Sequence, residues 1–326
     1  MELIVTPDNP APPGAVCTNV RTSDRVTIRV ARWHPQGEAR GTVLLAQGRA
    51  EFIEKYFETV ADLLARGFAV VTFDWRGQGL SSRATENRAK GHIDDFVFYE
   101  RDLDAVVTQA VQPFCPAPYF GLAHSTGAAI MLQQARRGAS PFARLVLLAP
   151  LIDISGLRFP QGARLLADFF NVLGLGGAFV PGGRSASIMA KPFEGNKLTS
   201  DPARYARNRA VVEAAPQLAI GDPTVGWVHA AFRQIDEFAD PDYPTRVLTP
   251  VLVVAAGGDR IVSTRAIERF GLRLKAGRVI VLEHARHEIL QERDVIRDRF
   301  WAAFDAFVPG EGAENGARAG RSASAS

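Results

Sequence analysis

Short apolar runs alternate along the chain with longer segments in which apolar residues recur every three or four positions. A continuous apolar run is typical of a strand buried in a parallel sheet, and the longer period is typical of a helix packed on that sheet. Strands are expected at 26–33, 42–46, 68–73, 119–124, 145–149, 251–256 and 278–282, and helices at 52–66, 94–111, 129–135, 263–272 and 288–307. This order predicts an α/β fold with a mostly parallel central sheet flanked by helices.

The alternation stops in three places, which divides the chain. Residues 1–20 contain four prolines and predict an irregular lead-in, because proline prevents helix formation. Residues 151–244 keep apolar segments but lose the strand-helix order, so we expect a mainly helical cap inserted between two parts of an α/β core, 21–150 and 245–308. Residues 309–326 are glycine, alanine, serine and arginine with no periodicity, which predicts a disordered tail.

Composition narrows the possible partners. The chain has 326 residues, 47% of them hydrophobic and 22% charged, as expected of a protein with a sizeable core. The net charge of +3 is small and the arginines are interleaved with acids, so there is no basic stripe of the kind that nucleic acid requires. Nucleic acid is therefore an unexpected partner.

Location is inferred from the cysteines and from the first residues. Two cysteines, Cys17 and Cys115, are too few for a disulfide framework, and the short apolar run after Met1 has no basic region before it. A cytoplasmic protein is expected. The apolar run at 165–180 is too short and broken to span a bilayer. It is interpreted as packing within the cap, with acyl-chain contact or transient, peripheral docking of the cap on a membrane surface as the alternative.

The segment around Ser125 has the form of a nucleophile elbow. The strand at 119–124 ends at this serine and a helix follows, with small residues, Ala123 and Gly127, two positions to either side. Small flanking residues are needed because strand and helix approach closely at such a turn. Alanine replaces the usual first glycine, which weakens the match without breaking it.

A serine hydroxyl needs a base and an anion that orients the base. Asp259 and His287 follow two later strands, so both are expected at the same sheet edge as Ser125. Asp153 is a rival for the anion, but the glycines before Asp259 favour the latter. The backbone N–H groups of Thr126 and Arg49 are the expected oxyanion donors, and the Arg49 side chain faces either an anionic substrate group or solvent.

Other motifs are interpreted as structural. The glycine-rich loop at 74–81 does not open a helix, so a phosphate-binding role is rejected, and Asp74 and Arg76 are expected to form a buried ion pair. His124 is expected to support the elbow. His284 and His287 have a metal-like spacing but no evident third ligand, so a metal is not expected.

Taken together, several motifs resemble the lysophospholipase and monoacylglycerol-lipase branch of the α/β-hydrolases. The resemblance covers residues of about 40–305. The motifs that carry it are at 47–49, 74–81, 91–96, 123–127, 258–259 and 285–289. The resemblance implies a cap, a serine esterase that cleaves a carboxylic ester of one acyl chain, a small-molecule acyl ester or lysolipid as substrate, and no cofactor. Gln47 departs from the pattern, because many relatives have histidine there.

Two alternatives remain open. A peptidase or amidase of the same fold, such as one that releases N-terminal proline, would need acidic residues in the cap to hold a substrate ammonium. Glu213, Asp236 and Glu237 are candidates. A non-catalytic ligand-binding protein of the same fold is the other alternative.

Overall fold

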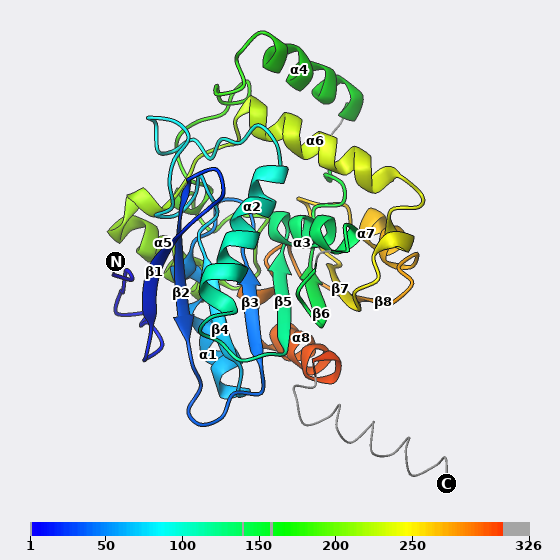
Figure 1. Cartoon of the computed structure of the whole chain (residues 1–326). Coiled ribbons are helices and arrows are strands. Elements are labelled where there is room, and N and C mark those ends of the chain that lie inside the picture. The colour runs from blue at the N-terminus through cyan, green and yellow to red at the C-terminus, as the bar shows by residue number, and fades with distance from the viewer. Residues whose placement is uncertain (1, 139, 157–158, 309–326) are drawn as a thin grey trace.

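A computed structural model describes residues 2–138, 140–156 and 159–308, and a single eight-stranded sheet runs through it (Figure 1). The strand order is β1-β2-β4-β3-β5-β6-β7-β8. β1 and β2, and β2 and β4, pair antiparallel, and all other neighbours pair parallel. The strands are β1 (Val16–Arg21), β2 (Thr27–Trp33), β3 (Thr42–Ala46), β4 (Ala69–Phe73), β5 (Tyr119–His124), β6 (Arg144–Leu148), β7 (Val251–Ala256) and β8 (Gly277–Leu282).

Helices cover both faces of this sheet. Outside the segment between β6 and β7 they are α1 (Phe57–Ala65), α2 (Val97–Val106), α3 (Thr126–Arg136), α7 (Thr264–Gly271) and α8 (Asp294–Phe307). The side chains of β3 contribute to two hydrophobic cores, one on each face of the sheet, because successive side chains of a strand point to opposite faces. Val43 and Leu45 pack in the core that contains α1 and α8, and Leu44 and Ala46 pack in the core that contains α2, α3 and α7. The uninterrupted apolar runs therefore reflect burial on both sides.

The segment between β6 and β7, residues 151–244, is here called the cap segment. It contains α4 (Pro160–Val172), α5 (Pro202–Ala214) and α6 (Val225–Ala239), and α4 packs on α6. Figure 1 shows α4 and α6 stacked at the top of the molecule, with α5 at its side. In the described residues no helix is both long enough and apolar enough to cross a membrane.

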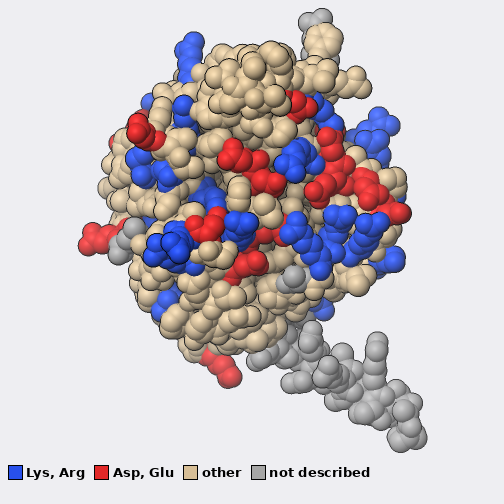
Figure 2. Space-filling view, turned by 45° about the horizontal axis from the view of Figure 1, so that its top comes forward, with Lys and Arg blue, Asp and Glu red and all other residues tan. Residues whose placement is uncertain are grey.

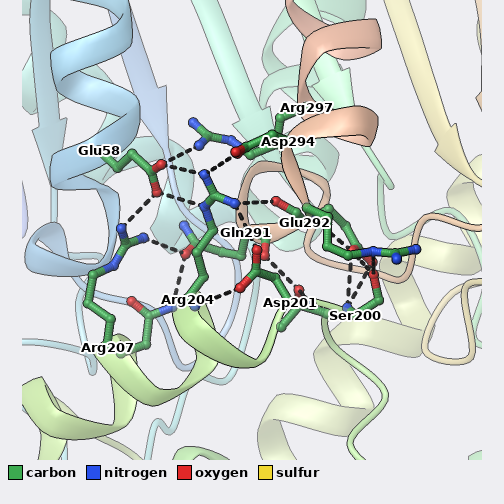
Figure 3. A network of polar contacts seen from close by, with 12 residues as sticks. Glu58, Ser200, Asp201, Arg204, Arg207, Gln291, Glu292, Asp294 and Arg297 are labelled. Atoms are coloured by element: carbon green, nitrogen blue, oxygen red, sulfur yellow. Dashed lines mark hydrogen bonds and ion pairs between the residues drawn. The ribbon is translucent and has the colours of Figure 1, made fainter.

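A network of charged side chains ties α5 to the core (Figure 3). Arg204 of α5 donates from Nε to the Glu58 carboxylate of α1 at 2.9 Å, and its Nη2 lies 2.6 Å from the carboxylate of Asp294, the first residue of α8. Arg207 and Arg297 bind the same Glu58 carboxylate. The guanidinium groups hold the pKa of Glu58 at about 2, although burial alone would raise it. Glu58 therefore stays ionised and joins three segments distant in sequence.

The structure corrects some boundaries expected from the sequence. The lead-in is not irregular throughout, because Val16–Arg21 pairs with β2 as an edge strand. The helix expected at 94–111 begins at Val97 and ends in a π-helical turn, Val107–Val111. The closing helix begins at Asp294, after a short 3-10 helix, Ile289–Gln291. The expected tail at 309–326 lies outside the described residues.

The expected pairing of Asp74 with Arg76 was wrong. The Asp74 carboxylate lies 3.3 Å from Nη1 of Arg29, whereas Arg76 binds Asp102 and Asp24, each at 2.7 Å. Both residues are buried and structural, but strand β2, the turn between β1 and β2, and helix α2 supply their partners. Adjacency in sequence gave no information on these pairings.

Candidate active site

Ser125 lies in a sharp turn between β5 and α3. Its φ of 51° and ψ of −112° are in a region that residues with side chains rarely adopt. The turn is held because the Ser125 N–H donates to the carbonyl oxygen of Leu148 at 2.9 Å. A Cβ at Gly127 would lie 2.5 Å from the carbonyl oxygen of Gln47, so the close approach requires glycine there. Ala123 is fully buried in β5, where its methyl group is accommodated.

Ser125, His287 and Asp259 form one hydrogen-bonded chain. Nε2 of His287 lies 3.0 Å from Oγ of Ser125, and Nδ1 of His287 lies 2.8 Å from Oδ2 of Asp259. The serine follows β5, the aspartate follows β7 and the histidine follows β8, so the carboxyl ends of three parallel strands supply all three. With Nδ1 donating to the carboxylate, Nε2 is left as an acceptor for the serine hydroxyl.

Backbone hydrogen bonds hold the Asp259 carboxylate in position beside the histidine. Its Oδ1 accepts the backbone N–H groups of Ile261 at 2.7 Å and Val262 at 3.0 Å. Burial alone would raise the pKa of Asp259, but the charge of His287 and these hydrogen bonds hold that pKa below its usual value. The rival Asp153 instead accepts the N–H of Ile154 at 2.9 Å. Asp259 is therefore the carboxylate that contacts the histidine, in its ionised form.

Two backbone N–H groups near Ser125 are free to act as donors. Thr126 is the first residue of α3, where N–H groups have no partner within the helix, and Arg49 follows β3. Within the described residues neither N–H has a hydrogen-bond acceptor, although Gly48 and Ala50 on either side of Arg49 each donate to a side chain. Arg49, Thr126 and Ser125 line the same cavity.

A buried group of charged residues holds the backbone of His287 in place through His124. Nε2 of His124 lies 3.0 Å from the carbonyl oxygen of His287, and Nδ1 lies 3.1 Å from Oε2 of Glu51. Both partners are acceptors, so the imidazole must be protonated on both nitrogens. Burial would lower the pKa of His124, but the Glu51 carboxylate outweighs it and raises that pKa. Nζ of Lys55 lies 2.8 Å from the carboxylate of Glu51 and 2.6 Å from the carboxylate of Glu288, so it links the two acids.

The cavity above Ser125 has a volume of about 330 Å³ and mostly apolar walls. A volume of this order suits a small ligand or part of an acyl chain. Core and cap segment both contribute to the walls. The larger apolar side chains that line it are Leu151, Ile154, Ile188, Met189, Leu198, Trp227, Val228 and Ile261.

The sequence located the three residues of the hydrogen-bonded chain but missed their supports. Glu51 and Glu288 carried no signal, because their role depends on contacts with residues distant in the chain. His124 was expected only to support the elbow, and it also holds the His287 backbone. The metal-like pair, His284 and His287, gains no third ligand: no group of three or more His, Cys, Asp or Glu in the described residues is arranged to hold a metal ion.

Comparison with known families adds to this geometry. The family described as "Serine aminopeptidase, S33" matches residues 37–294, which is most of the chain. The chain belongs to this α/β-hydrolase family. Among curated members, the "Probable lysophospholipase L2" of Haemophilus influenzae is 30% identical over 289 residues, covering 88% of this chain and 90% of the relative. The "Lysophospholipase L2" of Escherichia coli K12 is 32% identical over 287 residues, covering 84% and 82%.

Solved structures of this α/β-hydrolase fold superpose over nearly the whole chain. A soluble variant of the monoglyceride lipase of Saccharomyces cerevisiae aligns with a TM-score of 0.71 and 18% identity, covering 90% of this chain and 96% of that one. A carboxyl esterase of Bacillus coagulans aligns with a TM-score of 0.72 and 16% identity, covering 91% and 98%. At this identity they show the fold, so the expected α/β-hydrolase architecture is confirmed.

Proposed function

We propose that this protein is a serine hydrolase that cleaves the carboxylic ester of a single acyl chain, as a lysophospholipase does. The observation that carries the proposal is the chain of hydrogen bonds from Ser125 through His287 to Asp259 at the floor of an apolar cavity. Membership of the α/β-hydrolase family and the lysophospholipase names of its relatives support the same activity.

The proposed reaction proceeds through an acyl-enzyme. Ser125 Oγ attacks the ester carbonyl while Nε2 of His287 takes its proton, and the ionised Asp259 stabilises the resulting imidazolium. The backbone N–H groups of Arg49 and Thr126 stabilise the oxyanion, each contributing about 3 kcal/mol. His287 returns the proton to the leaving alcohol, and water then attacks the acyl-enzyme with His287 as base.

The cavity walls favour an acyl ester over an N-terminal amine. Their apolar side chains match the acyl chain of such a substrate. None of the three acids considered for binding an ammonium group lines the cavity. Glu213, Asp236 and Glu237 are instead paired with arginines outside it. An aminopeptidase activity thus gains no support from these residues.

We also propose that α4 brings the protein to a lipid surface. Ala167 is its one buried residue, and Figure 2 shows a mostly uncharged surface at the top of the molecule above a band of mixed charges. An exposed apolar face of this size is unusual unless it contacts another apolar surface. A membrane that holds the substrate is the occupant that fits the proposed reaction. The exposed apolar residues in and beside α4 are Phe159, Leu165, Leu166, Phe169, Val172, Leu173 and Leu175.

Binding to vesicles tests the α4 proposal. The double variant Leu165→Ser and Phe169→Ser is expected to cosediment with phosphatidylcholine vesicles at least several-fold less than wild type. Leu248→Ser changes an equally exposed leucine outside α4 and is the matched control. Equal cosedimentation of all three proteins would exclude α4 as the contact.

Hydrolysis of p-nitrophenyl esters from acetate to palmitate tests the reaction. Wild type is expected to release p-nitrophenol and to gain the mass of a fluorophosphonate adduct at Ser125, and Ser125→Ala is expected to do neither. Prolyl p-nitroanilide is the substrate for the peptidase alternative. Absence of both ester hydrolysis and adduct in wild type would refute the esterase and favour the non-catalytic ligand-binding alternative.

A further inference from the structure

The Arg49 side chain crosses from the core to the cap segment at the wall of the Ser125 cavity. Its Nη2 donates to the carbonyl oxygen of Gly221 at 2.8 Å, and its guanidinium carbon lies 5.2 Å from the centre of the Trp227 ring. Gly221 and Trp227 line the cavity together with Arg49. Of the described residues that line the cavity, Arg49 is the one arginine or lysine. The guanidinium therefore lies in the cavity wall, on the side formed by the cap segment.

This cation has no anionic partner at contact distance. Within the described residues no carboxylate approaches Arg49 closely enough to form an ion pair, and its buried Nε has no acceptor. Desolvation lowers the pKa of Arg49 to about 10, against a partial opposing effect of Tyr99 and Asp222. The side chain still carries its full charge at pH 7.

The other charged groups of the cavity do not neutralise Arg49. Glu51 and Glu288 are shared with Lys55, and His124 adds a second positive charge next to Glu51. Asp222 lies near Arg49 and accepts the backbone N–H of Arg184 at 2.9 Å. A partly buried cation held by a carbonyl and an indole ring is arranged to receive an anion, because charge-assisted hydrogen bonds strengthen where water is partly excluded.

We propose that the Arg49 guanidinium binds the phosphodiester of a lysophospholipid and so makes the enzyme prefer this substrate over a neutral monoacylglycerol. This inference rests on the proposed ester hydrolysis. The backbone N–H of Arg49 is the proposed oxyanion donor, so one residue would contact both the ester carbonyl and, through its long side chain, the phosphate on the same glycerol. The planar guanidinium matches a phosphate with two parallel N–H groups, which an ammonium does not.

The test compares two substrates with the same acyl chain, 1-palmitoyl-lysophosphatidylglycerol and 1-palmitoylglycerol, in wild type and Arg49→Gln. The substitution keeps the backbone N–H. We expect kcat/KM for the phosphate-bearing ester to fall about 10- to 100-fold further than kcat/KM for 1-palmitoylglycerol, as for loss of hydrogen bonds to a charged group. Any loss on 1-palmitoylglycerol measures what the contact of Arg49 with Gly221 of the cap segment contributes to both substrates. Arg49→Lys is expected to lose less than Arg49→Gln on the phosphate-bearing ester.

Arg83 supplies a matched control. It also reaches from the core to the cap segment, where its Nη2 donates to the carbonyl oxygen of Gln217 at 3.1 Å, and it does not line the cavity. Desolvation lowers the pKa of Arg83 to about 10 as well. Arg83→Gln is expected to leave the ratio of the two kcat/KM values at the wild-type level. A change in that ratio equal to the change in Arg49→Gln would overturn the proposal.

Two other results would also overturn it. Equal losses on both substrates would mean that Arg49 only fixes the cap segment, and no loss on either would mean that it does not contact the phosphate. Binding is measured separately in a Ser125→Ala background. There, adding Arg49→Gln is expected to raise the Kd for lysophosphatidylglycerol about tenfold or more. Unchanged binding rejects the Arg49 inference even if ester hydrolysis is established, and weakened binding supports it even if hydrolysis fails.

Discussion

Replacing His124 with alanine removes two buried hydrogen bonds at once. Loss of the Nε2 contact to the carbonyl oxygen of His287, at 3.0 Å, leaves that oxygen with the N–H of Ile289, at 3.2 Å, as donor. Loss of the Nδ1 contact to Glu51, at 3.1 Å, leaves a buried carboxylate with one donor fewer. A hydrogen bond that involves a charged group contributes about 1.5–3 kcal/mol, and both contacts of the doubly protonated imidazole are of this kind. Glu51 keeps Lys55 and Tyr56 as donors, which limits its loss.

We therefore expect His124→Ala to lower the free energy of unfolding by about 3 kcal/mol, within the range for a broken buried pair. The stabilising contribution of His124 is expected to fall as pH rises. The folded-state pKa of His124 is raised, so its contribution is complete below its ordinary pKa of about 6.5 and is lost as pH rises through the folded-state value. The stability difference between wild type and variant should therefore shrink under alkaline conditions.

Urea denaturation of wild type, His124→Ala and His229→Ala at several pH values measures this difference. His229 forms a similar contact, with Nδ1 2.8 Å from Asp168, but at the surface of the cap segment. Its loss is expected to cost below about 1 kcal/mol. If His124→Ala is no less stable than His229→Ala, or if its deficit grows as pH rises, the doubly protonated buried histidine is refuted.

Three further predictions follow from the same geometry. Asp259→Asn is expected to lower kcat on p-nitrophenyl butyrate about 10⁴-fold, because it favours the wrong tautomer of His287. Circular dichroism should show the same unfolded fraction as in wild type, and near-normal turnover would contradict the prediction. Gly127→Ala would place a methyl group 2.5 Å from a carbonyl oxygen and is expected to abolish activity and lower Tm, whereas Gly177→Ala, with no atom within 4 Å, should not. Arg204→Met is expected to lower the free energy of unfolding by about 1–2 kcal/mol at pH 7, after allowance for solvent screening of Glu58. Because the pKa of Glu58 is lowered to about 2, the Glu58 contribution to this difference should be complete above about pH 4.5 and be lost as pH falls toward 2. A difference that is as large at pH 2 as at pH 7 would exclude the ion pair as its source.

The sequence by itself determined where the buried strands of the core lie along the chain and which residues follow them. Runs such as 42–46 and 251–256 are apolar on both faces, and this property is local and leaves few alternatives to a buried parallel strand. Since parallel strands end at one edge, the residues after each strand could be assigned to a common site from sequence. Ser125, Asp259 and His287 were found in this way, and their side chains do meet.

Only the tertiary structure decided which polar groups pair. Asp74 and Arg76 are neighbours in sequence yet bind partners on β2 and α2, and Val16–Arg21 became a strand because β2 offered it an edge. Arg49 meets a carbonyl 172 positions away in the cap segment. Hydrogen bonds and ion pairs act over a few ångströms, so they depend on the final positions of distant segments, which a local pattern of apolar residues does not encode.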